Sequence, residues 1–199
     1  MKLSVIIPAA GFSRRAPSGN KLLERLPGGG TVLQHVALLL AGLGERELIV
    51  VTGHQSAAVE ESLRGLPLRC VHAEHHALGM GASLAAGVRA CAADADGFLV
   101  CPGDLPWLQA QTVAAVRDAF VAGRGLSHVI PASGGRRGHP VVLGAWLRAR
   151  LEALSGDEGA RVLLAGDPER GRVLELCVSD EGIHRDVDGG LSRGGSPSP

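Results

Sequence analysis

The chain has 199 residues and no formal net charge, with 20 basic and 20 acidic side chains. A neutral chain has no overall field to hold nucleic acid or an anionic membrane, and 3% aromatic residues without any Tyr argue against a base-stacking surface. The length suits one α/β domain. The apolar stretches are far shorter than the roughly 20 residues that cross a bilayer, and the four scattered cysteines favour a reducing compartment. We therefore expect a cytoplasmic protein.

The predicted elements alternate between strands and helices along most of the chain. Strands are expected at 3–7, 47–52, 68–72, 97–101, 127–132, 141–143 and 173–178, and helices at 31–40, 56–64, 79–92, 109–122, 145–154 and 159–164. This alternation predicts an α/β fold with a doubly wound, Rossmann-like, mostly parallel sheet and helices on both faces. We assign residues 1–188 to this domain and the Gly-, Ser- and Pro-rich residues 189–199 to a disordered tail.

The loop after the first strand combines small residues with cations. The small residues are Ala9, Ala10, Gly11 and Ser13, and the cations are Arg14, Arg15 and Lys21. Small residues let the backbone approach phosphate oxygens, and ligands of open α/β sheets bind at this edge. We predict that this loop cradles a triphosphate and that Arg15 and Lys21 stabilise departing pyrophosphate; the alternative is a plain turn with solvated cations.

A lone aspartate follows the fourth predicted strand, in the segment Pro102-Gly103-Asp104-Leu105-Pro106. Mg²⁺ prefers one or two carboxylates together with phosphate oxygens, so Asp104 is a candidate metal ligand. The alternative is a cap on the next helix. Asp186 and Asp188 alternate near the end of the domain; Asp188 is a candidate second ligand, and a solvated acidic turn is the alternative.

Further polar residues are expected around the nucleotide. The glycines and serine at 79–83 open a helix, so Gly79 and Ser83 are predicted to contact the nucleotide, although a simple helix start gives the same pattern. Thr52, at the end of the second strand, is also predicted to contact the nucleotide. His72, His75 and His76 lack the spacing of a closed zinc site, so we interpret them as loop residues.

Two later loops are candidates for binding a second, anionic substrate. The first is basic and ends in Gly138-His139-Pro140, and the second runs from Gly156 to Arg161 and contains Asp157 and Gly159. Together they would hold and orient a co-substrate. A structural hairpin is the alternative.

These motifs, taken in order, resemble the molybdenum cofactor cytidylyltransferase group of the MobA-like nucleotidyltransferases. The resemblance spans residues 3 to about 190, and its most restrictive parts are Gly-His-Pro at 138–140 and Gly-Asp-x-Gly-Ala-Arg at 156–161. Ala10 matches the Ala-Ala-Gly form of the cytidylyl branch. The chain departs from the family's usual pattern at Ala16-Pro17 and at Gly189-Gly190.

The resemblance implies a GT-A-type domain that uses Mg²⁺ to transfer CMP from CTP to the molybdenum–molybdopterin cofactor, with release of pyrophosphate. Asp104, assisted by Asp188, would hold the metal, and His139 with the 156–161 turn would seat the pterin cofactor. A molybdenum hydroxylase is a possible recipient of the product. The alternatives are a nucleotidyltransferase that activates a sugar or polyol phosphate, and a molybdopterin carrier without catalytic activity.

Overall fold

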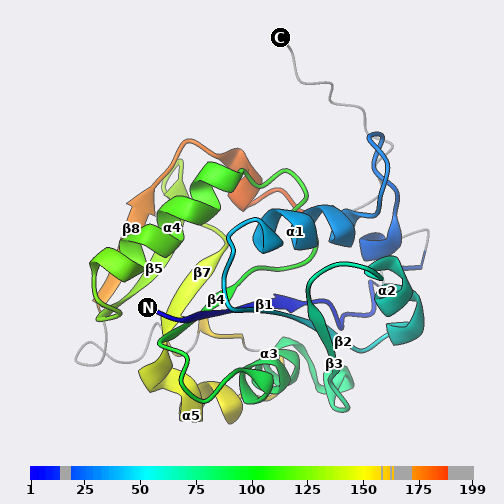
Figure 1. Cartoon of the computed structure of the whole chain (residues 1–199), viewed down its shortest axis with the longest axis horizontal. Helices are drawn as coiled ribbons and strands as arrows, with labels where there is room; N and C mark the ends of the chain where they lie inside the picture. The colour runs from blue at the N-terminus through cyan, green and yellow to red at the C-terminus, as the bar shows by residue number, and fades with distance from the viewer. Residues whose placement is uncertain (14–18, 158, 162, 164–171, 188–199) are drawn as a thin grey trace.

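In the computed structural model, eight strands form one mixed, mostly parallel sheet covered by helices on both faces (Figure 1). The structure describes residues 1–13, 19–157, 159–161, 163 and 172–187. The strands are β1 (Leu3–Pro8), β2 (Glu47–Thr52), β3 (Arg69–His72), β4 (Gly97–Val100), β5 (Ser127–Ser133), β6 (Arg136–Arg137), β7 (Val141–Gly144) and β8 (Arg172–Cys177). The expected fold class is therefore confirmed, and the predicted disordered tail lies outside the described residues.

The sheet runs in the order β3-β2-β1-β4-β7-β5-β6, and β8 pairs in parallel with β5. β1 is central and pairs in parallel with β2 and β4. β7 is antiparallel to β4 and β5. Because β7 runs against its neighbours, its N-terminal end lies at the edge where β1 and β4 end.

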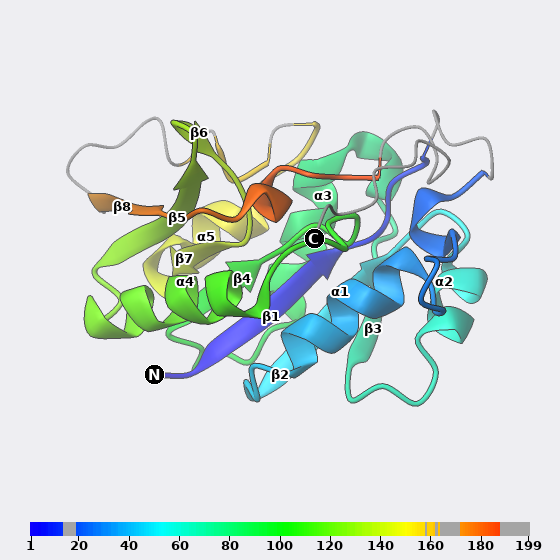
Figure 2. The same ribbon diagram turned by 90° about the horizontal axis from the view of Figure 1, so that it is seen from above.

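The α-helices lie in two layers. They are α1 (Val32–Ala41), α2 (Ser56–Ser62), α3 (Met80–Ala90), α4 (Ala110–Ala122) and α5 (Arg148–Glu152). α1, α2 and α4 cover one face and α3 and α5 the other (Figure 1), and Figure 2 shows α1 and α4 side by side across the sheet. Short 3-10 helices are η1 (Lys21–Leu23), η2 (His76–Leu78), η3 (Ala145–Leu147) and η4 (Glu181–Ile183).

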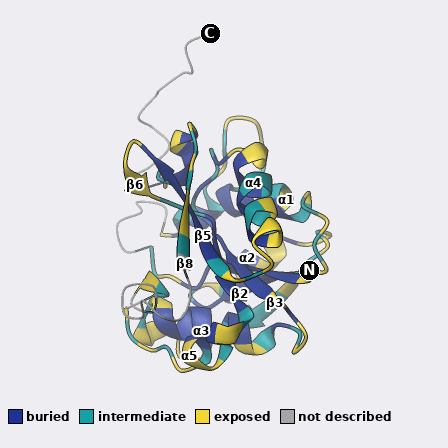
Figure 3. Ribbon diagram, turned by 90° about the vertical axis from the view of Figure 1, so that its left-hand side faces the viewer, coloured by how far each residue is buried: buried dark blue, intermediate teal, exposed yellow. Residues whose placement is uncertain are grey.

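The alternation of side chains along β1 explains why the protein has two cores. Val5 and Ile7 pack into the core under α1 and α4, whereas Ile6 faces α3 in the other core. All three are essentially inaccessible to solvent, as expected for a central strand of a parallel sheet. Figure 3 shows the same pattern, with central strands such as β2 and β5 buried and the outer faces of the helices exposed.

Most predicted helices are present with bounds shifted by one or a few residues. Thr31 caps α1 through a capping box with Gln34, as its sequence position predicted. The helix predicted at 145–154 is divided into η3 and α5. The helix predicted at 159–164 includes residues outside the described part of the chain. Among the described residues, no helix is both long and apolar enough to span a membrane.

Candidate functional site

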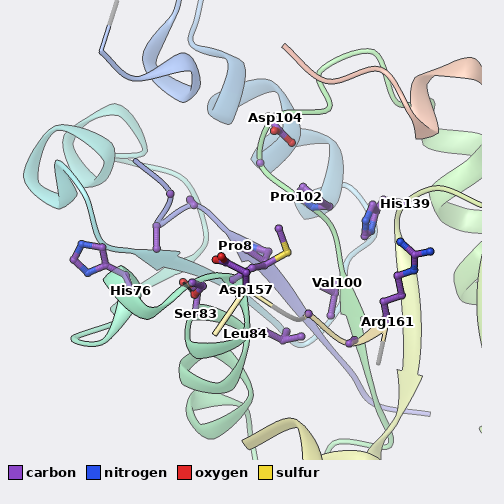
Figure 4. Close-up of a pocket in the computed structure, with 18 of the residues that line it drawn as sticks. Pro8, His76, Ser83, Leu84, Val100, Pro102, Asp104, His139, Asp157 and Arg161 are labelled. Atoms are coloured by element: carbon purple, nitrogen blue, oxygen red, sulfur yellow. Dashed lines mark hydrogen bonds between the residues drawn. The ribbon is translucent and has the colours of Figure 1, made fainter. Parts of the chain in front are cut away.

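A cavity of about 1350 Å³ lies at the edge of the sheet where β1 and β4 end (Figure 4). Small-molecule sites usually enclose about 300–1,000 Å³, so this cavity has room for more than one substrate. The segments that surround it are the β1 exit loop, η1, the start of α3, the β4 exit loop, the β6–β7 turn, Asp157 and residues 159–161. The loops that the sequence singled out therefore meet in one place.

Lys21 and Asp104 form an ion pair at this edge. Lys21 Nζ lies 2.6 Å from Asp104 Oδ2, and each side chain is only 19% exposed. Asn20 fixes the start of η1, because its side-chain oxygen accepts a hydrogen bond from Leu22 N–H at 3.1 Å. Helix α4 begins at Ala110, so Asp104 does not act as its cap. The two residues of the predicted triphosphate site thus lie together, as the hypothesis required.

The backbone around Asp104 packs closely on its neighbours. A Cβ on Gly103 would lie 2.7 Å from Leu33 Cδ1, so any larger residue at that position would require the Leu33 side chain to shift. The Asp104 carbonyl accepts a hydrogen bond from Val187 N–H at 3.1 Å. Burial, with a contribution from Asp104, raises the pKa of the Cys101 thiol far above its usual value. Cys101 therefore stays neutral beneath the site and is no candidate nucleophile.

The described residues offer one carboxylate, Asp104, for a metal ion beside the triphosphate site. No group of three or more His, Cys, Asp or Glu side chains capable of holding a metal occurs in the described ranges. A one-carboxylate site still fits Mg²⁺, which takes its other ligands from phosphate oxygens and water. Asp188, the predicted second ligand, lies outside the described residues, as do Arg14 and Arg15.

The β1 exit loop packs closely on its surroundings. Ala9 and Ala10 are buried, and Ala9 N–H donates to Val51 O at 2.9 Å. Ser13 adopts a positive φ of 47° and its hydroxyl lies 3.4 Å from Asn20 Oδ1. Asn20 is a residue that sequence reasoning missed: it is 2% exposed and joins the loop to η1.

Phe12 is a second residue that the sequence did not reveal. Its ring packs against those of His54 and His76, with centroid distances of 5.1 and 5.4 Å. Phe12 and His76 both line the cavity. The predicted loop histidine His76 therefore forms part of an aromatic wall.

The start of α3 is held against the 156–159 loop. Gly79 has φ 118°, and a Cβ there would overlap Asp157 Oδ1. Gly81 N–H donates to the Gly156 carbonyl at 2.9 Å. Ser83, near the start of α3, is 5% exposed and lines the cavity. Asp157, predicted to bind the second substrate, thus lies against the helix that was predicted to bind the nucleotide.

The opposite half of the cavity is built from the β6–β7 turn. A Cβ on Gly138 would collide with Ile183, and His139 N–H donates to the Ile183 carbonyl at 3.0 Å. Burial lowers the pKa of His139, although Asp104 and a hydrogen bond to Val100 act in the opposite sense. The imidazole is therefore neutral near pH 7. Its Nδ1 is buried without a hydrogen-bond partner in the structure described.

Three arginines line this same half of the cavity. Arg137 is paired with Glu175, with Nε 2.8 Å from Oε1. Neither the Arg136 side chain nor the Arg161 side chain has a hydrogen bond or ion pair within the described parts of the chain, and both residues are exposed. Figure 4 shows the Arg161 side chain extending toward His139. This half of the cavity therefore presents unneutralised positive charge.

Two predicted site residues are placed away from the cavity surface. Thr52 is fully buried, and its hydroxyl donates to Glu60 Oε1 at 3.2 Å. It holds α2 against β2, so we withdraw its assignment to the nucleotide. Pro140 is also buried outside the cavity lining. The remaining described site residues line the cavity: Ala9, Ala10, Gly11, Ser13, Lys21, Gly79, Ser83, Asp104, Gly138, His139, Asp157 and Gly159.

Comparison with solved structures supports this architecture. The chain is similar to Rv0371c from Mycobacterium tuberculosis H37Rv, with a TM-score of 0.80, 23% identity, and coverage of 94% of this chain and 93% of that one. It is also similar to a nucleotidyl transferase from Methanothermobacter (Mth528), with a TM-score of 0.74, 27% identity, and coverage of 89% and 88%.

Curated sequences and a family comparison agree with the structural result. The bifunctional protein GlmU of Methylibium petroleiphilum is 36% identical over 121 residues, which is 59% of this chain and 26% of that protein. The chain thus aligns with about a quarter of the length of this relative. Residues 5–173 match the family described as the MobA-like NTP transferase domain, a stretch that includes both halves of the cavity. On the strength of that match and the fold, the chain belongs to the MobA-like NTP transferase domain family.

Proposed function

We propose that the protein is a nucleotidyltransferase that moves a nucleoside monophosphate from an NTP to a phosphate-bearing acceptor. The observation that carries this proposal is the Lys21–Asp104 ion pair beside a cavity with room for two substrates. An acceptor phosphate oxygen attacks the α-phosphorus, the bond from that phosphorus to the bridging oxygen breaks, and pyrophosphate leaves. The attacking oxygen is already anionic, so no general base is required.

In the proposed reaction, the residues of the cavity have two tasks: they position the substrates and they stabilise the charge on the phosphates. Lys21 offers a cation to the phosphates and to the charge that develops on pyrophosphate. Asp104 would hold Mg²⁺, which when bound neutralises phosphate charge. Neutral His139 shapes the wall where the acceptor approaches and adds no charge of its own. Catalysis then depends on alignment of the two substrates.

The acceptor that we favour is the molybdenum–molybdopterin cofactor, with CTP as the nucleotide. This choice rests on the family resemblance of the motifs at 9–11, 138–140 and 156–161. The positive charge of Arg136 and Arg161 supports it, because guanidinium groups bind anionic groups such as phosphate in well-defined geometries. A molybdenum hydroxylase would then receive the product.

A second candidate is activation of a sugar or polyol phosphate. The observation that favours it is the similarity to GlmU proteins, of which the Methylibium petroleiphilum protein is 36% identical in the matched region. An acceptor of this class would need hydroxyl-binding groups as well as the arginines. The two candidates share the nucleotide half of the cavity and differ in the half formed by Arg136, His139 and Arg161.

The test measures pyrophosphate release from CTP, GTP, ATP and UTP with Mg²⁺, each with molybdopterin-type and sugar-phosphate acceptors. We expect release only when CTP and the molybdenum–molybdopterin cofactor are combined. Release with a sugar phosphate would select the second candidate. Tight pterin binding without turnover of any NTP would contradict nucleotidyl transfer and favour a carrier.

A further inference from the structure

We propose that the Asp157 carboxylate accepts a hydrogen bond from the exocyclic amino group of the nucleotide's base, and so selects an amino-bearing base such as cytosine over uracil. The inference rests on the proposed function, because it assigns a role within the same nucleotide site. It starts from the position of Asp157, which differs from the one expected from the sequence.

Asp157 belongs to the nucleotide half of the cavity. Its Oδ1 lies against Gly79, and the preceding residue, Gly156, accepts a hydrogen bond from Gly81 at 2.9 Å. The Met80 side chain reaches over Gly159, where a Cβ would lie 3.4 Å from the Met80 sulfur. These contacts join the 156–159 loop to the start of α3. The carboxylate itself lines the cavity and has no hydrogen bond or ion pair within the part of the chain described.

Charge excludes the phosphates from the neighbourhood of Asp157. The triphosphate belongs beside Lys21 and Asp104, where a cation and a metal-binding carboxylate meet. Figure 4 shows Asp157 next to Ser83 and apart from Asp104. An unpaired carboxylate repels phosphate, so the part of the nucleotide that Asp157 faces is the uncharged nucleoside.

The lining of this half indicates that the base, rather than the ribose, lies beside Asp157. Apolar and aromatic side chains surround the start of α3, and a flat base is the part of a nucleotide that such surfaces bind. They are Phe12, Ala77, Leu78, Met80 and Leu84. A carboxylate accepts hydrogen bonds and cannot donate them. Cytosine presents an N4 amino group at its edge, whereas uracil presents a carbonyl oxygen at the same position, which the carboxylate would repel.

The test compares CTP with UTP in the full-length protein with Mg²⁺. Isothermal titration calorimetry gives the two dissociation constants for the wild type, Asp157→Asn and Glu74→Gln. An asparagine can donate to the uracil oxygen, so we expect Asp157→Asn to lower the CTP-over-UTP preference by about tenfold or more. Glu74 is exposed, precedes η2 and does not line the cavity, so Glu74→Gln removes a nearby charge as the matched control and should leave the preference unchanged.

The outcomes separate this inference from the proposed function. An unchanged preference in Asp157→Asn, an equal change in Glu74→Gln, or a wild type that prefers UTP would overturn the role of Asp157 and leave nucleotidyl transfer standing. A wild type that binds no NTP would overturn both. If Asp157→Asn lowers the Tm, Asp157→Ser should give the same loss of preference, because it also removes the carboxylate.

Discussion

Separating Lys21 from Asp104 tests the centre of the site most directly. Asp104→Asn keeps the shape of the side chain and removes a negative charge 2.6 Å from Lys21 Nζ. Exposed ion pairs contribute about 0–1 kcal/mol, whereas loss of one partner of a buried pair costs about 3–5 kcal/mol. At 19% exposure on each side, we expect a loss of about 1–2 kcal/mol, or a Tm lower by about 2–8 °C for a domain of this size. The fold should survive.

The effect on activity should be far larger than the effect on stability. Without the carboxylate the proposed Mg²⁺ would lose its ligand Asp104, and loss of one such electrostatic group costs about a hundredfold to a thousandfold in kcat. Nucleotide binding without metal should not weaken in Asp104→Asn, because the substitution removes a negative charge 2.6 Å from Lys21 Nζ that would otherwise repel the phosphates. Lys21→Met should instead weaken nucleotide binding both with and without Mg²⁺.

The assay is a nucleotide titration by calorimetry at several Mg²⁺ concentrations, together with pyrophosphate release under saturating substrates. Circular dichroism confirms that each variant is folded. Wild-type turnover in Asp104→Asn would refute the metal-binding role. If Asp104→Asn and Lys21→Met weaken nucleotide binding without Mg²⁺ equally, the proposed roles are wrong: the Lys21 amine would not bind phosphate independently of the Asp104 carboxylate.

Three further predictions concern the framework of the site. Gly79→Ala places a Cβ against Asp157 at φ 118° and should lower the Tm by several degrees and abolish nucleotide-induced stabilisation, measured by thermal shift. Burial lowers the pKa of His128 to about 4, so the unfolded chain binds a proton that the folded chain does not, and stability falls as the pH drops from about 6.5 to 4. In urea unfolding, the free energy of unfolding should be lower at about pH 4.5 than at pH 7 by up to ~3 kcal/mol, and His128→Gln should reduce this difference. If the difference is the same in His128→Gln, other groups cause it. Asp180→Ala leaves the N–H groups of Gln109 and Gly182 without their acceptor and should cost about 2–4 kcal/mol in urea unfolding, while an unchanged KM for the nucleotide would confirm a purely structural role.

The strands were predictable because the pattern of apolar residues in each segment indicates which faces of the strand are buried. The run from Leu3 to Ile7 is apolar apart from Ser4, and only a strand covered on both faces can bury such a run. Glycines and prolines at the strand exits marked the loops that carry chemistry. Lys21 and Asp104 were predictable as neighbours for the same reason, since parallel strands bring their exit loops to one edge.

Contacts between side chains of different loops were not predictable. The packing of Phe12 against His54 and His76 depends on how three separate segments are placed relative to one another, which no local sequence pattern encodes. The same holds for Asp157, whose sequence neighbours suggested a role with the second substrate. Thr52 was misassigned because a polar residue at a strand end is as suited to bonding Glu60 as to binding a ligand.

The direction of β7 explains how one sheet edge would serve the two substrates of the proposed reaction. Gly134 and Gly135 both have positive φ, so the chain reverses tightly after β5 and β7 must run antiparallel to it. The residues that precede β7, including His139, therefore arrive at the edge where β1 and β4 end, instead of at the opposite edge where a parallel strand would begin. Lys21 and Asp104 approach from one side of that edge, and His139 with Arg136 from the other. A reaction between two phosphate groups requires such a meeting of loops, because the attacking and leaving oxygens must lie on opposite sides of the reacting phosphorus.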